Sequence, residues 1–554
     1  MNKFGKYLLA AAVAGVVAGS TIFAARNDFG LGRNMELLVN MMRELSVNYV
    51  DEIDPDVLMA DAAAGMVRSL DPYTEYYPES EMESFEVMAT GKYGGIGSII
   101  RQKEDYVRIA EPYKNSPADR AGLKIGDLIL EIDGQSAAGF TTEQVSNRLK
   151  GEPGSKVKVK VRHLDDTEQT VTIRRERITI PSIPYAGWVA EGIGYIRHND
   201  FTENCYEDMQ AAIARLRSEG ELQGLILDYR SNGGGVMQDA VKILGMFVPK
   251  GTTVLTLKGR TGEAGKAVYT TPSEPILPDL PLAVLINGNS ASAAEIVAGS
   301  LQDLDRAVLI GQRSFGKGLV QSTKSLGYNT MLKLTTQKYH IPSGRCIQAI
   351  DYSHSQQGSV RVVPDSLIRE FATRNGRKVY DGGGIMPDIR MDPQYISRFA
   401  ATLYALGFID DFGDEYTRRH PEAPADLLRF SITEADYADF AAFMQDKQVP
   451  YESDTRRALK SLREAVKNDR FEGVDEQLEA LEAGVKDDTQ TNLETYREQI
   501  VESINRDIVQ RHAYASGVIA HSLPTDAEVA RAVEVLRDPA EYRRILTEQD
   551  TERK

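Results

Sequence analysis

The chain has 554 residues, of which 42% are hydrophobic and 26% charged, and its formal net charge is −16. This composition is typical of a globular protein with about three or four domains. The acidic balance argues against a nucleic-acid-binding protein, which would need a clustered basic face. No CxxC or HExxH spacing occurs, which argues against a zinc site. Cys205 and Cys346 are too few for a disulfide framework, and the sequence leaves open whether they pair.

Residues 1–28 have the pattern of an export signal. Lys3 and Lys6 precede an apolar segment, Tyr7 to Ala25, whose length approaches the about 20 residues that cross a bilayer. Bulky side chains stand where a signal peptidase needs a small residue. We therefore favour an uncleaved transmembrane anchor over a cleaved peptide. In both cases we expect an exported protein, with the bulk of the chain in the periplasm or cell envelope. The favoured anchor would also attach it to the membrane through this segment.

Residues 29–84 form a helical N-terminal region. Apolar residues at helical spacing predict one helix from Asn34 to Tyr49 and a second from Pro55 to Leu70. The segment Leu70-Asp71-Pro72 then stops the second helix and begins a turn. We expect a domain boundary shortly after it.

Residues 85–176 contain short strands, turns and two short helices. Ser116 followed by Pro117 predicts a helix start, because serine caps helices and proline suits the first helical position. Thr141 and Gln144 have the spacing of a capping box. Val157–Arg162 and Gln169–Arg174 are expected to pair as a hairpin. The order of these elements resembles a PDZ domain in the circular arrangement found in bacterial proteases.

The PDZ resemblance implies a binding site for peptide C-termini. Such domains add the peptide to a sheet edge as an extra strand. The loop Gly94-Gly95-Ile96-Gly97 would offer backbone N–H groups to the terminal carboxylate. Ile96, Ile99 and Val145 would shape the pocket for the last side chain. The plain alternative is that these glycines only lead the chain into a strand.

Residues 177–395 contain two strand-to-helix turns of chemical interest. The first follows the buried strand Gly224–Asp228 and continues as Tyr229-Arg230-Ser231-Asn232-Gly233-Gly234-Gly235, before a helix from Val236 to Met246. Backbone N–H groups at such a turn point at an anion. The turn lacks the GK[ST] ending of a phosphate-binding P-loop. Tight packing of a helix start against a strand would also explain its glycines.

The second turn follows the apolar strand Pro281–Ile286. Asn287-Gly288-Asn289 makes the turn, and Ser290 to Leu301 has the spacing of a helix. A further strand, Ala307–Ile310, leads into the loop Ser314-Phe315-Gly316-Lys317-Gly318. A serine at a helix N-terminus lies beside free N–H groups and the positive end of the helix dipole, which suits a developing oxyanion.

A nucleophilic serine also needs a base, and this second turn contains no histidine. A lysine can serve if burial keeps it neutral near pH 7, so we expect Lys317 to have low exposure. The plain alternative makes Ser290 or Ser292 an ordinary helix cap and Lys317 a surface residue.

Two linked motifs carry a family resemblance. Ser290-Ala291-Ser292-Ala293-Ala294-Glu295, followed by Phe315-Gly316-Lys317-Gly318-Leu319-Val320-Gln321, resembles the signature of the C-terminal processing peptidases, or tail-specific proteases. The resemblance implies that Ser292 is the nucleophile, Lys317 the general base and Gln321 the residue that orients the lysine. It implies no metal and no cofactor.

The resemblance also assigns an oxyanion hole and a fold. The glycine run is similar to the family's Asp-Leu-Arg-x-Asn-x-Gly-Gly motif, which implies Gly234 and Ala293 as N–H donors, with Gly233 as the alternative glycine. The implied fold is a multidomain α+β protein. It has a helical N-terminal region, a PDZ-like β domain, a crotonase-like ββα peptidase core and a helical C-terminal domain.

Two further segments resemble family motifs near the active site, Tyr339 to Arg345 and Gly383 to Asp388. His340 lies in the first of them. Because the family uses the lysine, we interpret His340 as structural and not as part of a triad.

Residues 396–554 predict a helical C-terminal domain rich in leucine, alanine and charged residues. The expected helices are Phe399–Leu406, Tyr437–Met444, Ala458–Val466, Gln477–Ala483, Leu493–Ile508 and Ala527–Leu536. No catalytic constellation occurs among them, and the charged faces are expected to be solvated. A helical cap, an element of a homo-oligomer or a partner-binding arm would all fit.

Together these patterns predict a serine endopeptidase that cleaves exported or envelope proteins near their C-termini and recruits the tails through its PDZ domain. Its partners are proteins or peptides with free C-termini, and not nucleic acids. Two alternatives remain: a non-catalytic envelope scaffold that binds C-termini, and a peptidase of the same fold that cleaves general peptides.

Overall fold

The protein is described by a computed structural model that covers residues 30–260, 262–352, 361–362, 368–471, 473–485 and 488–548. The chain divides into two compact units. One comprises the chain up to Met82 with Gln321–Thr335 and Tyr352–Val360, and the other comprises the remainder. Within the described ranges, no helix has both the length and the apolarity to cross a membrane. The predicted anchor, Tyr7 to Ala25, lies outside those ranges.

The first unit contains the predicted N-terminal helices. The first helix covers residues 30–48, and most of its apolar side chains are exposed. The second, α2, covers Pro55–Val67; Asp54 caps it by accepting the N–H groups of Asp56 and Val57. A short strand, β1 (Glu75–Tyr77), then pairs antiparallel with the first part of β18 (Thr330–His340).

The PDZ-like domain belongs to the second unit. Its sheet has the order β3-β4-β5-β7-β8, with β6 paired to β5. The strands are β3 (Ser98–Lys103), β4 (Tyr106–Pro112), β5 (Leu128–Ile132), β6 (Gln135–Ser136), β7 (Lys156–Arg162) and β8 (Glu168–Arg174). Helix α4 (Pro117–Arg120) and helix α5 (Thr142–Leu149) complete the domain. α5 lies against β3, which is one of the two edge strands of the sheet.

The local predictions for this domain are confirmed. The Ser116 hydroxyl caps α4, and Thr141 and Gln144 form the capping box that begins α5. β7 and β8 pair as the expected hairpin. One element was not foreseen: β2 (Lys92–Gly95) pairs with β9 (Glu176–Thr179), so the chain enters and leaves the domain through a two-stranded ribbon. The pairing occupies Gly94 and Gly95.

The core domain is built on a six-stranded sheet of order β10-β11-β12-β15-β16-β23. These strands are β10 (Tyr185–Ala190), β11 (Ile193–Arg197), β12 (Gly224–Asp228), β15 (Leu282–Ile286), β16 (Val308–Gly311) and β23 (Ile389–Arg390). The pairing is parallel throughout, except between β10 and β11. Because both faces of this sheet are covered, its central strands are continuous apolar runs.

Each face of the core sheet has its own helical layer. Leu225 and Leu227 point toward α6 (Cys205–Glu219), α7 (Met237–Leu244) and α8 (Ala293–Asp303), and contribute to one apolar cluster. Ile226, between them, points to the other face, as the period of two requires.

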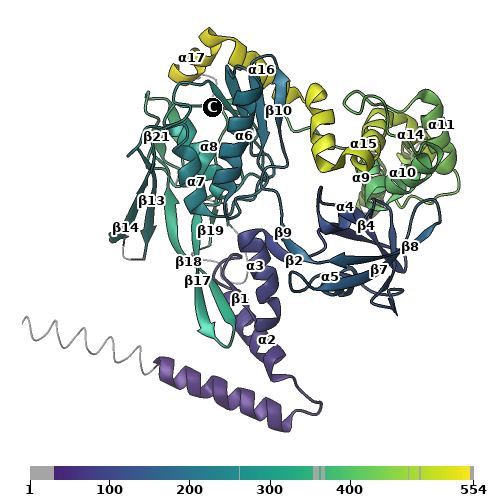
Figure 1. Cartoon of the computed structure of the whole chain (residues 1–554), viewed down its shortest axis with the longest axis horizontal. Coiled ribbons are helices and arrows are strands. Elements are labelled where there is room, and N and C mark those ends of the chain that lie inside the picture. The colour runs from purple at the N-terminus through teal and green to yellow at the C-terminus, as the bar shows by residue number, and fades with distance from the viewer. Residues whose placement is uncertain are drawn as a thin grey trace, which may run out of the picture. The chain divides into compact units, whose positions relative to one another are not determined.

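The second face is covered by helices from the end of the chain (Figure 1). α16 (Ala527–Arg537) and α17 (Pro539–Thr547) contribute Val529, Val535 and Leu546 to this apolar cluster. Both lie in the predicted C-terminal helical domain; α16 was expected as the helix Ala527–Leu536, whereas α17 was not predicted as a helix. Their burial against the sheet makes them a structural part of the core.

Five of the remaining C-terminal helices contribute to a separate apolar cluster. They are α9 (Arg398–Ala405), α10 (Phe408–Arg419), α11 (Glu434–Phe443), α14 (Thr489–Thr495) and α15 (Arg497–Ser522). The other two, α12 (Asp454–Asp469) and α13 (Asp475–Gly484), contact each other. The expectation that the charged faces of the C-terminal helices are all solvated is wrong. Arg511 on α15 is 3% exposed and pairs with Asp414 on α10 at 2.7 Å, because this face packs against the PDZ-like domain.

Candidate active site

Ser290 and Ser292 have different environments at the turn that follows β15. The Ser290 side chain is fully buried. Its Oγ donates to the carbonyl of Tyr229 at 2.8 Å and accepts the N–H of Asn287 at 2.9 Å. Through these two bonds the Ser290 hydroxyl holds the turn against the glycine run that follows β12. It is therefore a structural residue.

Ser292 immediately precedes α8 and is half-buried. Its backbone has φ 56° and ψ −116°, a region that residues other than glycine rarely occupy. Ala293 opens the helix, so its N–H has no acceptor within the helix, and the dipole is positive at that end. The structure thus presents a serine hydroxyl at a strained turn beside an available N–H group.

Glu295 connects the serine turn to the lysine loop. Its side chain is fully buried. One carboxylate oxygen accepts the Ser314 hydroxyl at 2.5 Å and the Gly316 N–H at 2.7 Å, and the other accepts the N–H groups of Ser292 and Lys317, both at 2.9 Å. Burial raises the pKa of this carboxyl, although the four donors oppose that shift.

Tyr339 on β18 makes a second connection between the same two segments. Its hydroxyl lies 3.2 Å from the carbonyl oxygen of Ser292 and 2.5 Å from that of Lys317, within donating distance of both. The side chain is 1% exposed. The backbones of the predicted nucleophile and base are therefore held in one framework by a buried carboxylate and a buried hydroxyl.

Lys317 lies on the loop between β16 and β17 (Leu319–Gly327) and is half-buried, so the expected low exposure is met only in part. The loop must reach the surface where a substrate would bind. Gly316 has φ +85°, and a Cβ there would lie 2.5 Å from the Cβ of Ala349. A Cβ on Gly318 would lie 2.9 Å from the backbone N of Gln348. These close contacts explain why the lysine has glycine on both sides.

Gln321 belongs to the first unit, where its amide donates to Thr335 Oγ1 at 3.1 Å. The Thr335 hydroxyl in turn donates to Asp71 in the Leu-Asp-Pro segment at 3.1 Å. Asp71 also accepts the N–H groups of Tyr73 and Thr74. Gln321 thus ends a polar chain that begins at the N-terminal region. Its role in orienting Lys317 stays a prediction.

The glycine run after β12 lies directly against the serine turn. A Cβ on Gly234 would be 2.6 Å from the Cβ of Ser292 and 2.8 Å from the N of Ala293, and the φ of Gly234 is +93°. Only glycine allows this approach. The Gly234 N–H donates to the side chain of Asn232 at 2.8 Å. Among the described residues, no acceptor takes the N–H of Gly233.

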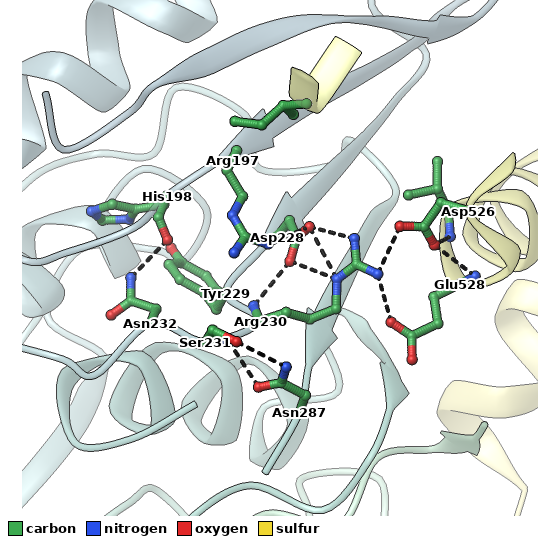
Figure 2. Close-up of polar contacts among 12 residues, drawn as sticks. Arg197, His198, Asp228, Tyr229, Arg230, Ser231, Asn232, Asn287, Asp526 and Glu528 are labelled. Atoms are coloured by element: carbon green, nitrogen blue, oxygen red, sulfur yellow. Dashed lines mark hydrogen bonds and ion pairs between the residues drawn. The ribbon is translucent and has the colours of Figure 1, made fainter. Parts of the chain in front are cut away.

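Ion pairs anchor the start of this run, as Figure 2 shows. The guanidinium of Arg230 pairs with Asp228 at 2.6 Å and, through its other nitrogen, with Asp526 at 2.8 Å and Glu528 at 2.7 Å on the first turn of α16. Burial alone would raise the pKa of Asp228, but Arg230 and Arg197 outweigh it and lower the pKa to about 2. The C-terminal helices thereby contact the segment that leads to Gly234.

The histidines near this region have structural contacts. His340 Nδ1 lies 3.1 Å from the carbonyl of Gly344, which closes the turn predicted there. His198 is fully buried, and its ring lies 4.3 Å from that of Phe201. Burial lowers the pKa of His198 to about 4, so it is neutral at pH 7.

Cys205 and Cys346 are both free. No group of three or more metal-ligating side chains occurs in the part of the chain that the structure describes.

The predicted carboxylate loop of the PDZ-like domain spans two structures. Gly94 and Gly95 lie in the β2–β9 ribbon, and a Cβ on Gly94 would be 2.3 Å from the carbonyl of Gly151. Ile96 and Gly97 follow the ribbon and lead into β3. Ile96 and Val145 are buried in the domain core, whereas Ile99 is 46% exposed. Whether these residues bind a peptide stays a prediction.

Sequence reasoning missed two residues of the core site, Glu295 and Tyr339. Glu295 was used only as a landmark for Ser292. The spacing of a serine and a glutamate three residues later is the capping-box signal, which could have indicated that this carboxylate binds backbone N–H groups. No comparable signal identifies Tyr339, because its contacts depend on the pairing of distant strands.

Comparison with known proteins agrees with this architecture. Three family descriptions match: "Peptidase family S41" at residues 192–365, "PDZ domain" at 108–163, and "Probable PDZ-protease, C-terminal helical domain" at 399–536. A "Carboxy-terminal-processing protease" of Bartonella bacilliformis is 32% identical over 348 residues, covering 61% of this chain and 79% of the relative. A "Probable CtpA-like serine protease" of Staphylococcus aureus is 33% identical, covering 61% and 68%.

Among solved structures, the "photosystem II D1 C-terminal processing protease" is 25% identical and covers 64% of this chain and 87% of that one, with a TM-score of 0.35. A PDZ domain of a carboxy-terminal protease from Vibrio cholerae, solved with a peptide, is 30% identical over 16% of this chain and 99% of that one, with a TM-score of 0.15.

The fold, the family descriptions and the two relatives define a multidomain serine protease with a PDZ domain. The chain belongs to peptidase family S41 and is a carboxy-terminal-processing serine protease. The predicted fold class is confirmed: N-terminal helices, a PDZ β domain, an S41 core and a C-terminal helical domain.

Proposed function

We propose that Ser292 is the nucleophile and Lys317 the general base of an endopeptidase that cleaves exported or envelope proteins near their C-termini. One observation carries the proposal. The buried Glu295 carboxylate accepts the backbone N–H groups of both residues, so the serine turn and the lysine loop are held together. A scaffold that only binds peptides would have no use for a strained serine held against a lysine loop.

In this mechanism neutral Lys317 takes the proton from Ser292 Oγ, and Ser292 attacks the scissile carbonyl. The Ala293 N–H and a glycine N–H stabilise the oxyanion. Lys317 then gives the proton to the leaving amine, and water hydrolyses the acyl-enzyme. The Gly234 N–H donates to the Asn232 side chain, so it must break that hydrogen bond before it can donate to the substrate oxygen. The Gly233 N–H has no such bond to break among the described residues.

The PDZ domain recruits the substrate by adding its tail as a strand to β3, the free edge beside α5. The site is therefore directed to proteins with free C-termini. The N-terminal segment, Tyr7 to Ala25, places the enzyme outside the cytoplasm as an anchored protein. A reporter fused after residue 28, active only when exported, tests that placement independently of catalysis.

The test of catalysis is cleavage of a denatured protein that ends in an apolar tail, followed from mildly acid to alkaline pH. We expect wild-type activity to rise with pH as the lysine loses its proton, and to disappear in Ser292→Ala and Lys317→Ala. Lys250→Ala, at an exposed lysine of the core, is the control and should remain active. Activity that survives Ser292→Ala would refute this mechanism, and an inactive but tail-binding wild type would favour a scaffold.

A further inference from the structure

The PDZ domain and the C-terminal helical domain enclose a cavity next to the edge at which a tail is proposed to bind. The cavity has a volume of about 370 Å³. Arg101 of β3 lines it from the PDZ side, and Tyr404 of α9 and Arg506 of α15 line it from the helical side. Tyr404 is 55% exposed, so the cavity opens toward solvent.

Successive side chains of a strand lie on opposite faces of the sheet. The residues of β3 show which of these faces borders the cavity. Ile100 pairs with Ile109 and packs in the PDZ core, beneath α5. Arg101 pairs with Arg108, and both line the cavity. A peptide added to β3 must alternate in the same way. Every second side chain of a bound tail therefore points away from the PDZ core and toward the helical domain.

Buried ion pairs hold together the strand and helices that line the inner side of the cavity. Arg108 is 2% exposed and pairs with Asp410 at 2.8 Å and Asp414 at 3.0 Å. Arg511 pairs with Asp414 and with Asp507, both at 2.7 Å. Because these contacts join β4 to α10 and α15, the cavity is preorganised before any peptide arrives.

The charges at the cavity are not all compensated. Arg108 and its acidic partners neutralise one another on the inner wall. Arg101 and Arg506 are exposed, and the guanidinium of neither has a hydrogen bond or ion pair with any residue in the described ranges. Two such guanidinium groups favour a carboxylate, which an arginine can bind through two parallel hydrogen bonds.

Register indicates which tail residue is involved. If the last residue of the tail lies opposite Ser98, where β3 begins, an antiparallel tail places its fourth residue from the end opposite Arg101. That residue is on the alternate face, beside the cavity.

We propose that the C-terminal helical domain completes the tail-binding site of the PDZ domain, and that Arg101 and Arg506 select substrates with an acidic side chain at the fourth position from the C-terminus. The inference rests on the proposed recruitment of tails along β3. It gives the helical domain a role in substrate selection.

The test measures binding of fluorescent twelve-residue peptides to the full-length Ser292→Ala protein, which binds without cleaving. The peptides share one sequence and differ only in having Glu, Gln or Lys at the fourth position from a free C-terminus. We expect the Glu peptide to bind about five- to tenfold more tightly than the Gln peptide at low salt, with the preference shrinking as salt screens the charges. Arg506→Gln should reduce the preference below about twofold, and Arg506→Glu should shift it to Lys.

Arg456→Gln, at an exposed arginine of α12 in the same domain, should keep the wild-type preference. Equal binding of the three peptides would overturn the inference about acidic tails. If, in addition, a C-terminally amidated peptide failed to bind, the proposed recruitment of free C-termini would still hold. Binding that ignores amidation, or no binding at all, would overturn both recruitment and the inference. Circular dichroism of each variant confirms that the helical domain is folded.

Discussion

Exchanging Glu295 for glutamine tests whether the carboxylate between the serine turn and the lysine loop positions the catalytic groups. The amide keeps the shape of the side chain but removes the charge. Its NH2 group is best placed toward Ser314, because a hydroxyl can rotate to accept it. The Gly316 N–H, 2.7 Å away in the wild type, then faces a donor. The bonds from Ser292 and Lys317 remain but lose their charge-assisted character.

The magnitude follows from these contacts. Leaving one buried N–H without an acceptor costs about 1–3 kcal/mol, and each of the two weakened bonds loses about 0.5–1 kcal/mol. Because a neutral amide is less costly to bury than a carboxylate, part of this loss is offset. A net loss of about 2–3 kcal/mol corresponds to a fall in kcat of roughly 30- to 150-fold if it acts on the transition state.

The assay compares kcat and KM of wild type, Glu295→Gln and Ser314→Ala on one tailed substrate. Ser314→Ala removes one donor from the Oε1 side and also leaves the Ile385 N–H without the Ser314 hydroxyl as its acceptor. It keeps the carboxylate bonds to Ser292 and Lys317, so its kcat should fall less than about tenfold. KM should stay within about threefold of wild type in both variants, since Glu295 is buried and positions the backbone without touching substrate. A Glu295→Gln enzyme with wild-type kcat would refute the positioning role.

Three further predictions concern the core. Gly234→Ala should lower kcat at least about 100-fold, because the new Cβ would lie 2.6 Å from the Cβ of Ser292, whereas Gly233→Ala, whose Cβ meets nothing within 4 Å, should leave peptidase activity near wild type. Glu528→Gln removes one anionic partner of Arg230 and should lower the free energy of unfolding by about 1–2 kcal/mol, measured by urea denaturation; no loss would mean that Asp526 alone suffices. The pKa of His198 is lowered to about 4, so the unfolded chain binds more protons below pH 6.5, and about 3 kcal/mol of stability should be lost as pH falls from 6.5 to 4. His198→Phe should flatten this acid slope in denaturation curves; an unchanged slope would place the sensitivity elsewhere.

Features set by neighbouring residues could be predicted from the sequence. Serine at a helix start, the Thr141–Gln144 box and the β7–β8 hairpin depend on contacts within a few residues, and each occurs as expected. Ser292 and Lys317 were predicted as site residues because two short motifs resemble those of a known family. Local chemistry and motif spacing therefore predict the elements on which the candidate site lies.

Features set by distant contacts could not be predicted. The period of α16 indicates an apolar face but not that the face covers the core sheet. Asp410, Asp414 and Arg511 have the composition of a solvated surface, and only the fold shows that they bury one another against Arg108. Likewise, nothing near Gly234 in the sequence shows that this glycine packs against Ser292. These facts depend on which elements meet in space.

The helices after residue 396 contact both the PDZ domain and the core segment that carries the candidate active site. On α15, Arg506 lines the cavity beside β3, and Arg511 is paired within the buried ion cluster. The same helix leads through a short turn to α16, where Glu528 binds Arg230 at the start of the glycine run that packs on Ser292. One continuous stretch of chain therefore borders the proposed tail site at one end and contacts the proposed oxyanion segment at the other. A domain that served only as a cap on the PDZ domain would not need the second contact, so these contacts argue against a cap as its sole role.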